Sequence, residues 1–282
     1  IPEGVVKADI EGVLAAAGLY EEIGLDESAE ATYRSLADRD FAYRINLAAY
    51  LSRRGKLEES FRICNSILTK ERLLDICSIG IAGAVRHAAK ISNEEMDQVN
   101  QWIAAAKKEY PYSIDLITQE AALLSARAST LSAEESKQNY QKALELIRAV
   151  PLEKMNENQQ GLIANNLAYM TVKTGGDIDV ALENIDLAFD LLGPRIELLD
   201  TRATINIEKG DFDKAIGDLE QATLFRVDSG VYYFHLALAY QGKGNRAAAA
   251  TALQKAEDLK FTGEKIDSMD REKYLKLQRW LR

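Results

Sequence analysis

The feature that most constrains this chain is a spacing of 34 residues that recurs in its C-terminal half. One series of glycines and two series of alanines keep this step: Gly176, Gly210 and Gly244; Ala181, Ala215 and Ala249; Ala188, Ala222 and Ala256. Composition alone does not explain three independent series with one step. A fixed period of roughly 20 to 50 residues is typical of chains that stack one small structural unit many times. The sequence therefore predicts a repeat protein with one continuous core.

The small residues of the repeat have a steric meaning. Ahead of each glycine lies a helical stretch with a residue pair that ends in alanine: Leu167-Ala168, Arg202-Ala203 and Leu236-Ala237. Where two helices cross at the short end of the usual distance of roughly 8 to 10 Å, only Ala, Gly or Ser fits between them. Larger side chains recur at helical spacing and fill the space between neighbouring helices: Phe212, Leu219, Leu236 and Leu253. The pattern predicts closely packed helix pairs joined by a glycine turn.

This arrangement resembles the tetratricopeptide repeat family, in which a Leu-Gly/Ala pair, a tyrosine, a glycine turn and two further alanines recur in each helix-turn-helix unit. The pattern is clear over about residues 161–260, where Tyr240 supplies the tyrosine, and weaker copies extend toward the N-terminus. The resemblance implies an all-α fold, a right-handed superhelical solenoid of helix-turn-helix repeats. The C-terminal units are also similar to the repeat regions of large planctomycete-type bacterial multidomain proteins, on the stretches 193–194, 198–203 and 233–237.

The same layout predicts a single solenoid over residues 1–282 that ends in a capping helix. Its expected parts are two N-terminal repeats at 1–70, two degenerate repeats at 71–157, three well-matched repeats at 158–260 and the capping helix at 261–282. In the degenerate part, residues 93–108 and 133–149 are predicted to be second helices. The last segment places apolar residues roughly on one helical face: Ile266, Met269, Tyr274, Leu277 and Leu281. Such a helix closes the apolar face that a terminal repeat leaves open.

Charge and composition argue against several classes of partner. Asp and Glu number 44 against 35 Lys and Arg, so no basic face is expected and nucleic acid is not a predicted partner. No apolar run reaches the roughly 18 residues of a membrane-spanning helix, so membrane insertion is not predicted either. Cys64 and Cys77 lie in apolar helical stretches without metal or redox spacing. We expect buried free thiols and a cytoplasmic location, with the periplasm left open.

No group of side chains has the pattern of a catalytic or metal site. His87 and His235 have no carboxylate or second ligand on their own helical faces, so both are interpreted as structural. Three carboxylate pairs begin predicted second helices, where the helix dipole stabilises negative charge: Glu58-Glu59, Glu94-Glu95 and Glu134-Glu135. The sequence therefore predicts neither an enzyme nor a bound cofactor.

The resemblance also implies where a partner binds. In tetratricopeptide proteins the first helix of each unit lines a concave groove. Carried onto the matching units, the groove positions are Asn165, Tyr169, Lys173, Asp200, Thr204, Glu208, Phe234, Leu238 and Gln241, and the N-terminal units add Ile45, Ala49 and Arg53. These positions predict a protein–protein interaction scaffold that binds a peptide or partner protein. Glu197 and Asp200 stand where binding of acidic chaperone tails requires cations, so a neutral or basic segment is favoured.

Two other classes of function remain open from the sequence. The chain begins at isoleucine, so we expect either a piece of a longer polypeptide or a chain that has lost a leader. In the first case the partner is either another protein or another domain of the parent. In one alternative the chain is an accessory domain of an enzyme, or a helical hydrolase with inward carboxylates of raised pKa in a deep cavity. In the other it is an architectural self-association module, recognised by a flat groove and an exposed apolar end surface.

Overall fold

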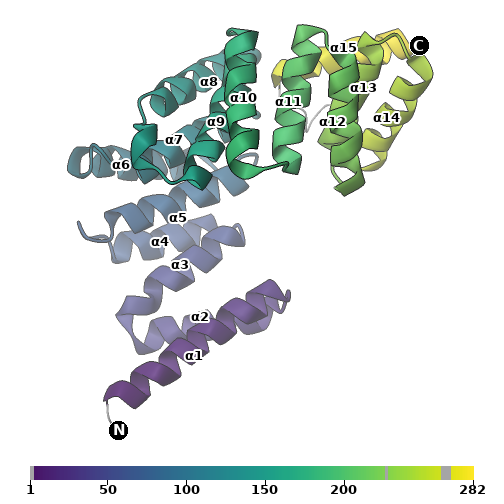
Figure 1. Ribbon diagram of the computed structural model, residues 1–282. Coiled ribbons are helices and arrows are strands. Elements are labelled where there is room, and N and C mark those ends of the chain that lie inside the picture. The colour runs from purple at the N-terminus through teal and green to yellow at the C-terminus, as the bar shows by residue number, and fades with distance from the viewer. Residues whose placement is uncertain (1–2, 226–227, 262–267) are drawn as a thin grey trace. The chain divides into compact units, whose positions relative to one another are not determined.

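The computed structural model describes residues 3–225, 228–261 and 268–282. Within these ranges the chain forms fifteen α-helices and two short 3-10 helices, and no strand (Figure 1). The all-α prediction is therefore confirmed. The helices fall into two compact units, Ile1–Leu123 and Leu124–Arg282, whose boundary lies inside α7 (Ile114–Ala128).

The N-terminal unit consists of consecutive helices that pack against their neighbours in the chain. Their bounds are α1 Glu3–Glu22, α2 Asp26–Arg39, α3 Arg44–Arg53, α4 Leu57–Ser66, α5 Leu73–Arg86 and α6 Asn93–Glu109, with a 3-10 turn at Phe41–Tyr43. Aromatic contacts mark its core, where Phe61 meets Trp102 edge to face with ring centroids 5.0 Å apart. Cys64 and Cys77 are free and buried, as predicted. Burial raises the pKa of both thiols to about 12, so they remain neutral core residues.

The C-terminal unit contains the three best-matched helix pairs. After a 3-10 turn at Leu152–Lys154, they are α9 Glu157–Lys173 with α10 Ile178–Leu192, α11 Ile196–Lys209 with α12 Phe212–Phe225, and α13 Gly230–Gly242 with α14 Arg246–Asp258. Before them lies α8 (Ala133–Arg148), and α15 (Ser268–Leu281) follows them. The six alanines that keep the 34-residue step are all 0% exposed. This complete burial agrees with the predicted position at tight helix crossings, where a larger side chain would not fit.

The glycine series needs one correction. Gly175, Gly210 and Gly244 adopt the left-handed backbone conformation that suits glycine at a helix end, with φ of 73°, 87° and 76°. Gly176 is the next residue and does not have this conformation. Between the left-handed glycine and the start of the second helix, the α9–α10 connection thus contains one residue more than the other two connections. First helices step by 35 residues from Ala168 to Ala203, while the second-helix alanines keep a step of 34.

Two of the acidic pairs noted in the sequence lie in the first turns of helices. Ser92 caps α6 and Ser132 caps α8, and in each case the glutamate three residues later bonds back to the cap in a capping box. The expected second helices at 93–108 and 133–149 are thereby confirmed to within one residue. A third capping box at the start of α9, formed by Asn156 and Gln159, was not anticipated.

The last helix contacts the start of the unit as well as its final helix pair. α15 contacts α13 and α14, and it also contacts α8, far back in the chain (Figure 1). Tyr274 and Leu277, two of the apolar residues predicted to face the cap interface, are buried, whereas Ile266 lies outside the described residues. A helix that only closed the end of the stack would not reach α8.

Candidate functional site

The nine predicted groove positions of the C-terminal unit lie on three first helices. α9 carries Asn165, Tyr169 and Lys173 at steps of four residues, which places them on one face. The remaining positions are Asp200, Thr204 and Glu208 on α11 and Phe234, Leu238 and Gln241 on α13. We call the side of α9, α11 and α13 that carries these nine positions the first-helix surface.

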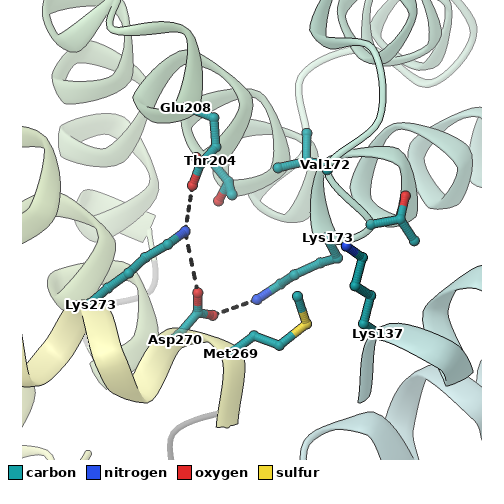
Figure 2. A pocket seen from close by; sticks show the side chains of 10 residues that line it. Lys137, Val172, Lys173, Thr204, Glu208, Met269, Asp270 and Lys273 are labelled. Carbon is teal, nitrogen blue, oxygen red and sulfur yellow. Dashed lines mark hydrogen bonds and ion pairs between the residues drawn. The ribbon is translucent and has the colours of Figure 1, made fainter. Parts of the chain in front are cut away.

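Part of the first-helix surface is covered by α15. Lys173 donates from Nζ to Oδ2 of Asp270 at 2.5 Å, and its side chain is only 7% exposed. Beside this pair, Lys273 forms ion pairs with Glu208 and, at 3.6 Å, with Asp270 (Figure 2). Four charged side chains thus form one network, Lys173 and Glu208 from the predicted positions and Asp270 and Lys273 from α15. The sequence pattern gave no sign of it.

The pKa of Asp270 shows how strongly the network holds its charge. Burial alone would raise that pKa, but the Lys173 ammonium, together with His235 and Lys273, outweighs it and lowers the pKa below its ordinary value. The Lys173 ammonium also lies 5.6 Å from the ring centroid of Tyr169. The Asp270 carboxylate is therefore kept ionised beside the Lys173 ammonium.

A second buried pair links α11 to α13. His235 is 7% exposed, and its Nδ1 lies 2.6 Å from Oδ1 of Asp200. Burial would lower the pKa of His235, but the charge and hydrogen bond of Asp200 raise it above the ordinary value. Asp200 precedes His235 by 35 residues, which is about one repeat. A search for opposite charges one repeat apart could therefore have found this pair in the sequence. The structural role expected for this histidine agrees with its position.

Three of the nine positions differ from the expectation of an open groove. Phe234 is 0% exposed and its ring contacts those of Phe261 and Tyr274, with centroids 5.6 and 5.9 Å away. Leu238 and Lys173 are also buried. The reason is packing: α13 contacts α11, α12, α14 and α15, so little of its circumference faces solvent, and α15 covers the end of α9.

The other positions stay at least partly accessible. Thr204 and Glu208 line an open pocket of about 240 Å³ together with Val172, Lys137 and Met269 (Figure 2). Gln241 and Asn165 are half-buried. The Oδ1 of Asn165 is buried and makes no hydrogen bond within the part of the chain that the structure describes. A buried acceptor without a donor costs roughly 1 to 3 kcal/mol.

The N-terminal groove positions are engaged within their own unit. Ile45 and Ala49 pack against its core, and Arg53 donates two hydrogen bonds to the Glu21 carboxylate at 2.7 and 2.6 Å. This contact raises the pKa of Arg53 and lowers that of Glu21, in both cases chiefly through the hydrogen bond between them. Arg53 is therefore not a free cation.

Few features within the described ranges suggest catalysis. Carboxyl groups with a shifted pKa are all shifted downward, the opposite of a buried general acid. Residues of known placement contain no group of three or more His, Cys, Asp or Glu arranged to hold a metal ion. Of the helices in these ranges, none has both the length and the apolar character needed to cross a membrane.

Comparison with known proteins points to one family. A tetratricopeptide repeat model matches residues 231–262, which correspond to α13, α14 and the residues directly after them. No curated protein matches the chain. Among solved structures, a tetratricopeptide repeat protein from Parabacteroides merdae ATCC 43184 is similar over 96% of this chain and 98% of its own, with 16% identity and a TM-score of 0.58.

A second similar structure is a chain of the APC/C hetero-tetramer Cut9–Hcn1. It shares 13% identity over 91% of this chain, with a TM-score of 0.56, and this chain spans about half of its length, 47%. Identities this low establish the fold alone, and the similarity to planctomycete-type proteins is not supported by them. Tetratricopeptide folds generally mediate protein–protein interactions and are typically non-catalytic. The chain thus contains a tetratricopeptide repeat and has the all-helical fold of tetratricopeptide solenoid proteins.

Proposed function

We propose that this chain is a protein-interaction scaffold that binds a peptide or partner protein on the first-helix surface of its C-terminal unit. One observation carries the proposal: this surface already holds a helix. α9, α11 and α13 each contribute a side chain to α15, namely Lys173, Glu208 and Phe234. A surface that holds one helix of its own chain has the width, charge and apolar area to hold a segment of a partner.

Asn165 supports the same surface. Its amide group can hydrogen-bond the backbone of a peptide in any sequence, and its oxygen has no donor within the described residues. Tyr169, on the same face of α9, offers apolar area with few rotamers to lose. The N-terminal positions have less support, since Arg53 is already paired with Glu21.

The partner is a protein segment, from another protein or from another domain of the parent chain. The net charge of -9 argues against nucleic acid. We propose a non-catalytic role without a cofactor, and the cytoplasm as location, because a reducing compartment suits two buried free thiols. The overall organisation as a single solenoid stays a prediction, as do the enzyme-accessory and self-association alternatives.

The proposal is tested by a groove variant with a matched control. Asn165→Ala, Thr204→Ala and Gln241→Ala together remove one accessible side chain from each first helix. Glu183→Ala, Gln221→Ala and Gln254→Ala remove one exposed side chain from each second helix. Chemical cross-linking in source cells, followed by mass spectrometry, should recover a partner with the wild type and the control but not with the groove variant. A folded groove variant that keeps every partner would refute the proposal.

A further inference from the structure

The buried residues of α15 lie on one face of the helix. Its buried residues are Asp270, Tyr274 and Leu277, which stand at positions i, i+4 and i+7 and so share one face of the helix. Asp270 meets the buried Lys173, Tyr274 meets Phe234, and Leu277 is part of the apolar core of the unit. The buried contacts of α15 are therefore one carboxylate, one aromatic ring and one aliphatic side chain, and Trp280 and Leu281 are partly buried against the same core.

Polar contacts surround these three residues. The Tyr274 hydroxyl donates to Glu257 at 2.8 Å, and Gln278 donates to the same carboxylate at 3.3 Å. At the other end of the helix, the hydroxyls of Ser268 and Ser136 lie 2.9 Å apart. Interfaces with a small apolar centre and a polar rim are typical of contacts that form and separate, whereas helices of a permanent core are apolar over most of their surface.

The helix α13 provides the contrast within the same unit. Eight of its thirteen residues are buried, against three of fourteen in α15. Because local opening takes least free energy where the fewest apolar groups are buried, α15 is the helix of this pair that opens first. Its release would uncover Lys173 and Phe234 together.

The charge of Lys173 and the ring of Phe234 determine which side chains a helix on this surface can carry. A carboxylate opposite Lys173 is favoured, and a basic residue there would leave two like charges close together. The rim adds Glu208, which pairs with Lys273, three residues after Asp270. The segment 268–282 carries five Lys and Arg against two Asp and Glu, so a helix that is basic overall sits on a chain that is acidic overall.

We infer that α15 is an internal occupant of a helix-binding site, and that the partner of this site is an amphipathic helix that replaces α15. The inference rests on the proposed function of the first-helix surface. The partner helix carries Asp or Glu at the position that corresponds to Asp270. Relative to that position it carries Lys or Arg three residues later, an aromatic residue four residues later and an aliphatic residue seven residues later. Binding of such a partner is held back by α15 until the partner outcompetes it.

Hydrogen exchange of the wild-type chain tests the first half of the inference. Amides of α15 should exchange at least about tenfold faster than those of α13, because α15 opens without unfolding the repeats. Equal protection of the two helices would overturn the inference, since α15 would then leave only on global unfolding. This measurement needs no substitution and so does not depend on a variant that folds.

A peptide tests the second half. The probe is the fluorescently labelled, end-capped segment 268–282. The full-length variant Asp270→Lys should release its own α15, because lysine would face Lys173, and should bind the peptide at least about tenfold more tightly than the wild type. The same peptide with Asp270→Lys should not bind. Adding Lys173→Glu to the variant restores opposite charges, so its own α15 should dock again and exclude the wild-type peptide.

The outcomes separate the two proposals. If the Asp270→Lys chain keeps the melting profile of the repeats but does not bind the peptide, the inference about α15 is wrong. In that case the triple groove variant still decides the proposed function by itself. If the peptide binds as expected but the groove variant keeps every cellular partner, α15 is a displaceable helix and the proposed function fails.

Discussion

Both units have ion pairs between neighbouring repeats, such as Lys209 with Asp179 in the C-terminal unit, but they differ in where other charged side chains find partners. In the N-terminal unit, ion pairs join helices of neighbouring repeats: Arg53 of α3 binds Glu21 of α1, and Arg34 of α2 binds Glu59 of α4. In the C-terminal unit, Lys173 and Glu208 pair with α15, which lies outside the repeats. The difference teaches where to look for recognition in a repeat protein. The informative places are those where the repeats do not satisfy each other's charges.

The largest expected effect comes from breaking the buried pair under α15. Breaking such a pair costs up to roughly 3 to 5 kcal/mol when the remaining charge stays buried. In Lys173→Met we expect α15 to undock instead, so that Asp270 returns to water. The chain has two tryptophans, Trp102 in the N-terminal unit and Trp280 on α15. With 5-fluorotryptophan labelling, the ¹⁹F resonance of Trp280 should shift and that of Trp102 should not.

A change at a helix crossing should come second. Ala249→Leu overpacks a site with no exposed surface and should lower the free energy of unfolding by about 1 to 3 kcal/mol. Ala250→Leu, at the next and exposed position of α14, is the matched control and should change it little. Denaturant melts of both variants measure the difference. Equal midpoints would show that Ala249 does not lie at a tight crossing.

The third effect depends on pH. The pKa of His235 is raised in the folded state, so its pairing with Asp200 stabilises the folded chain. This stabilisation is fully present below the ordinary histidine pKa of about 6.5 and is lost as the pH rises through the folded-state pKa. The free energy of unfolding should therefore decrease as the pH is raised above neutrality. Asp200→Asn should flatten this dependence. An unchanged slope in denaturant titrations of the variant between pH 6 and 9 would contradict the assignment.

The smallest effect is expected in the N-terminal unit. The Arg53 side chain is 38% exposed, and ion pairs at such sites contribute about 0.2 to 1 kcal/mol. Arg53→Met should lower stability by no more than this and should leave the ¹⁹F resonance of Trp280 in place. Should Arg53→Met cost as much as Lys173→Met in the same denaturant series, the contrast between the two units would not hold.

The repeats could be predicted from the sequence because of steric constraints on their helix crossings. The tight crossings at Ala181, Ala215 and Ala249 accept only small residues, so the sequence records them directly. Local signals also placed α6 and α8, because each is a long amphipathic stretch with an acidic pair in its first turn. The all-helical repeat fold followed from these features, without any knowledge of long-range contacts.

The contacts of the candidate site could not be predicted in the same way, because they join residues far apart in the sequence. Lys173 and Asp270 are 97 residues apart. The apolar pattern of Tyr274 and Leu277 shows that α15 is covered on one side, but it does not say which surface covers it. For the same reason Phe234 was assigned to an open groove: its position on a first helix is local information, whereas its burial depends on Phe261 and Tyr274.

The additional residue in the α9–α10 turn has a practical consequence. Gly175 and Gly176 are exposed, and the alanine crossings on both sides of the turn are intact despite the change in length. Length variation at this point is therefore absorbed by the turn and does not pass into the helices. Exposed turns with this property tolerate foreign insertions. A short epitope placed between Gly175 and Gly176 would provide a handle for purification or imaging that leaves the helix pairing unchanged.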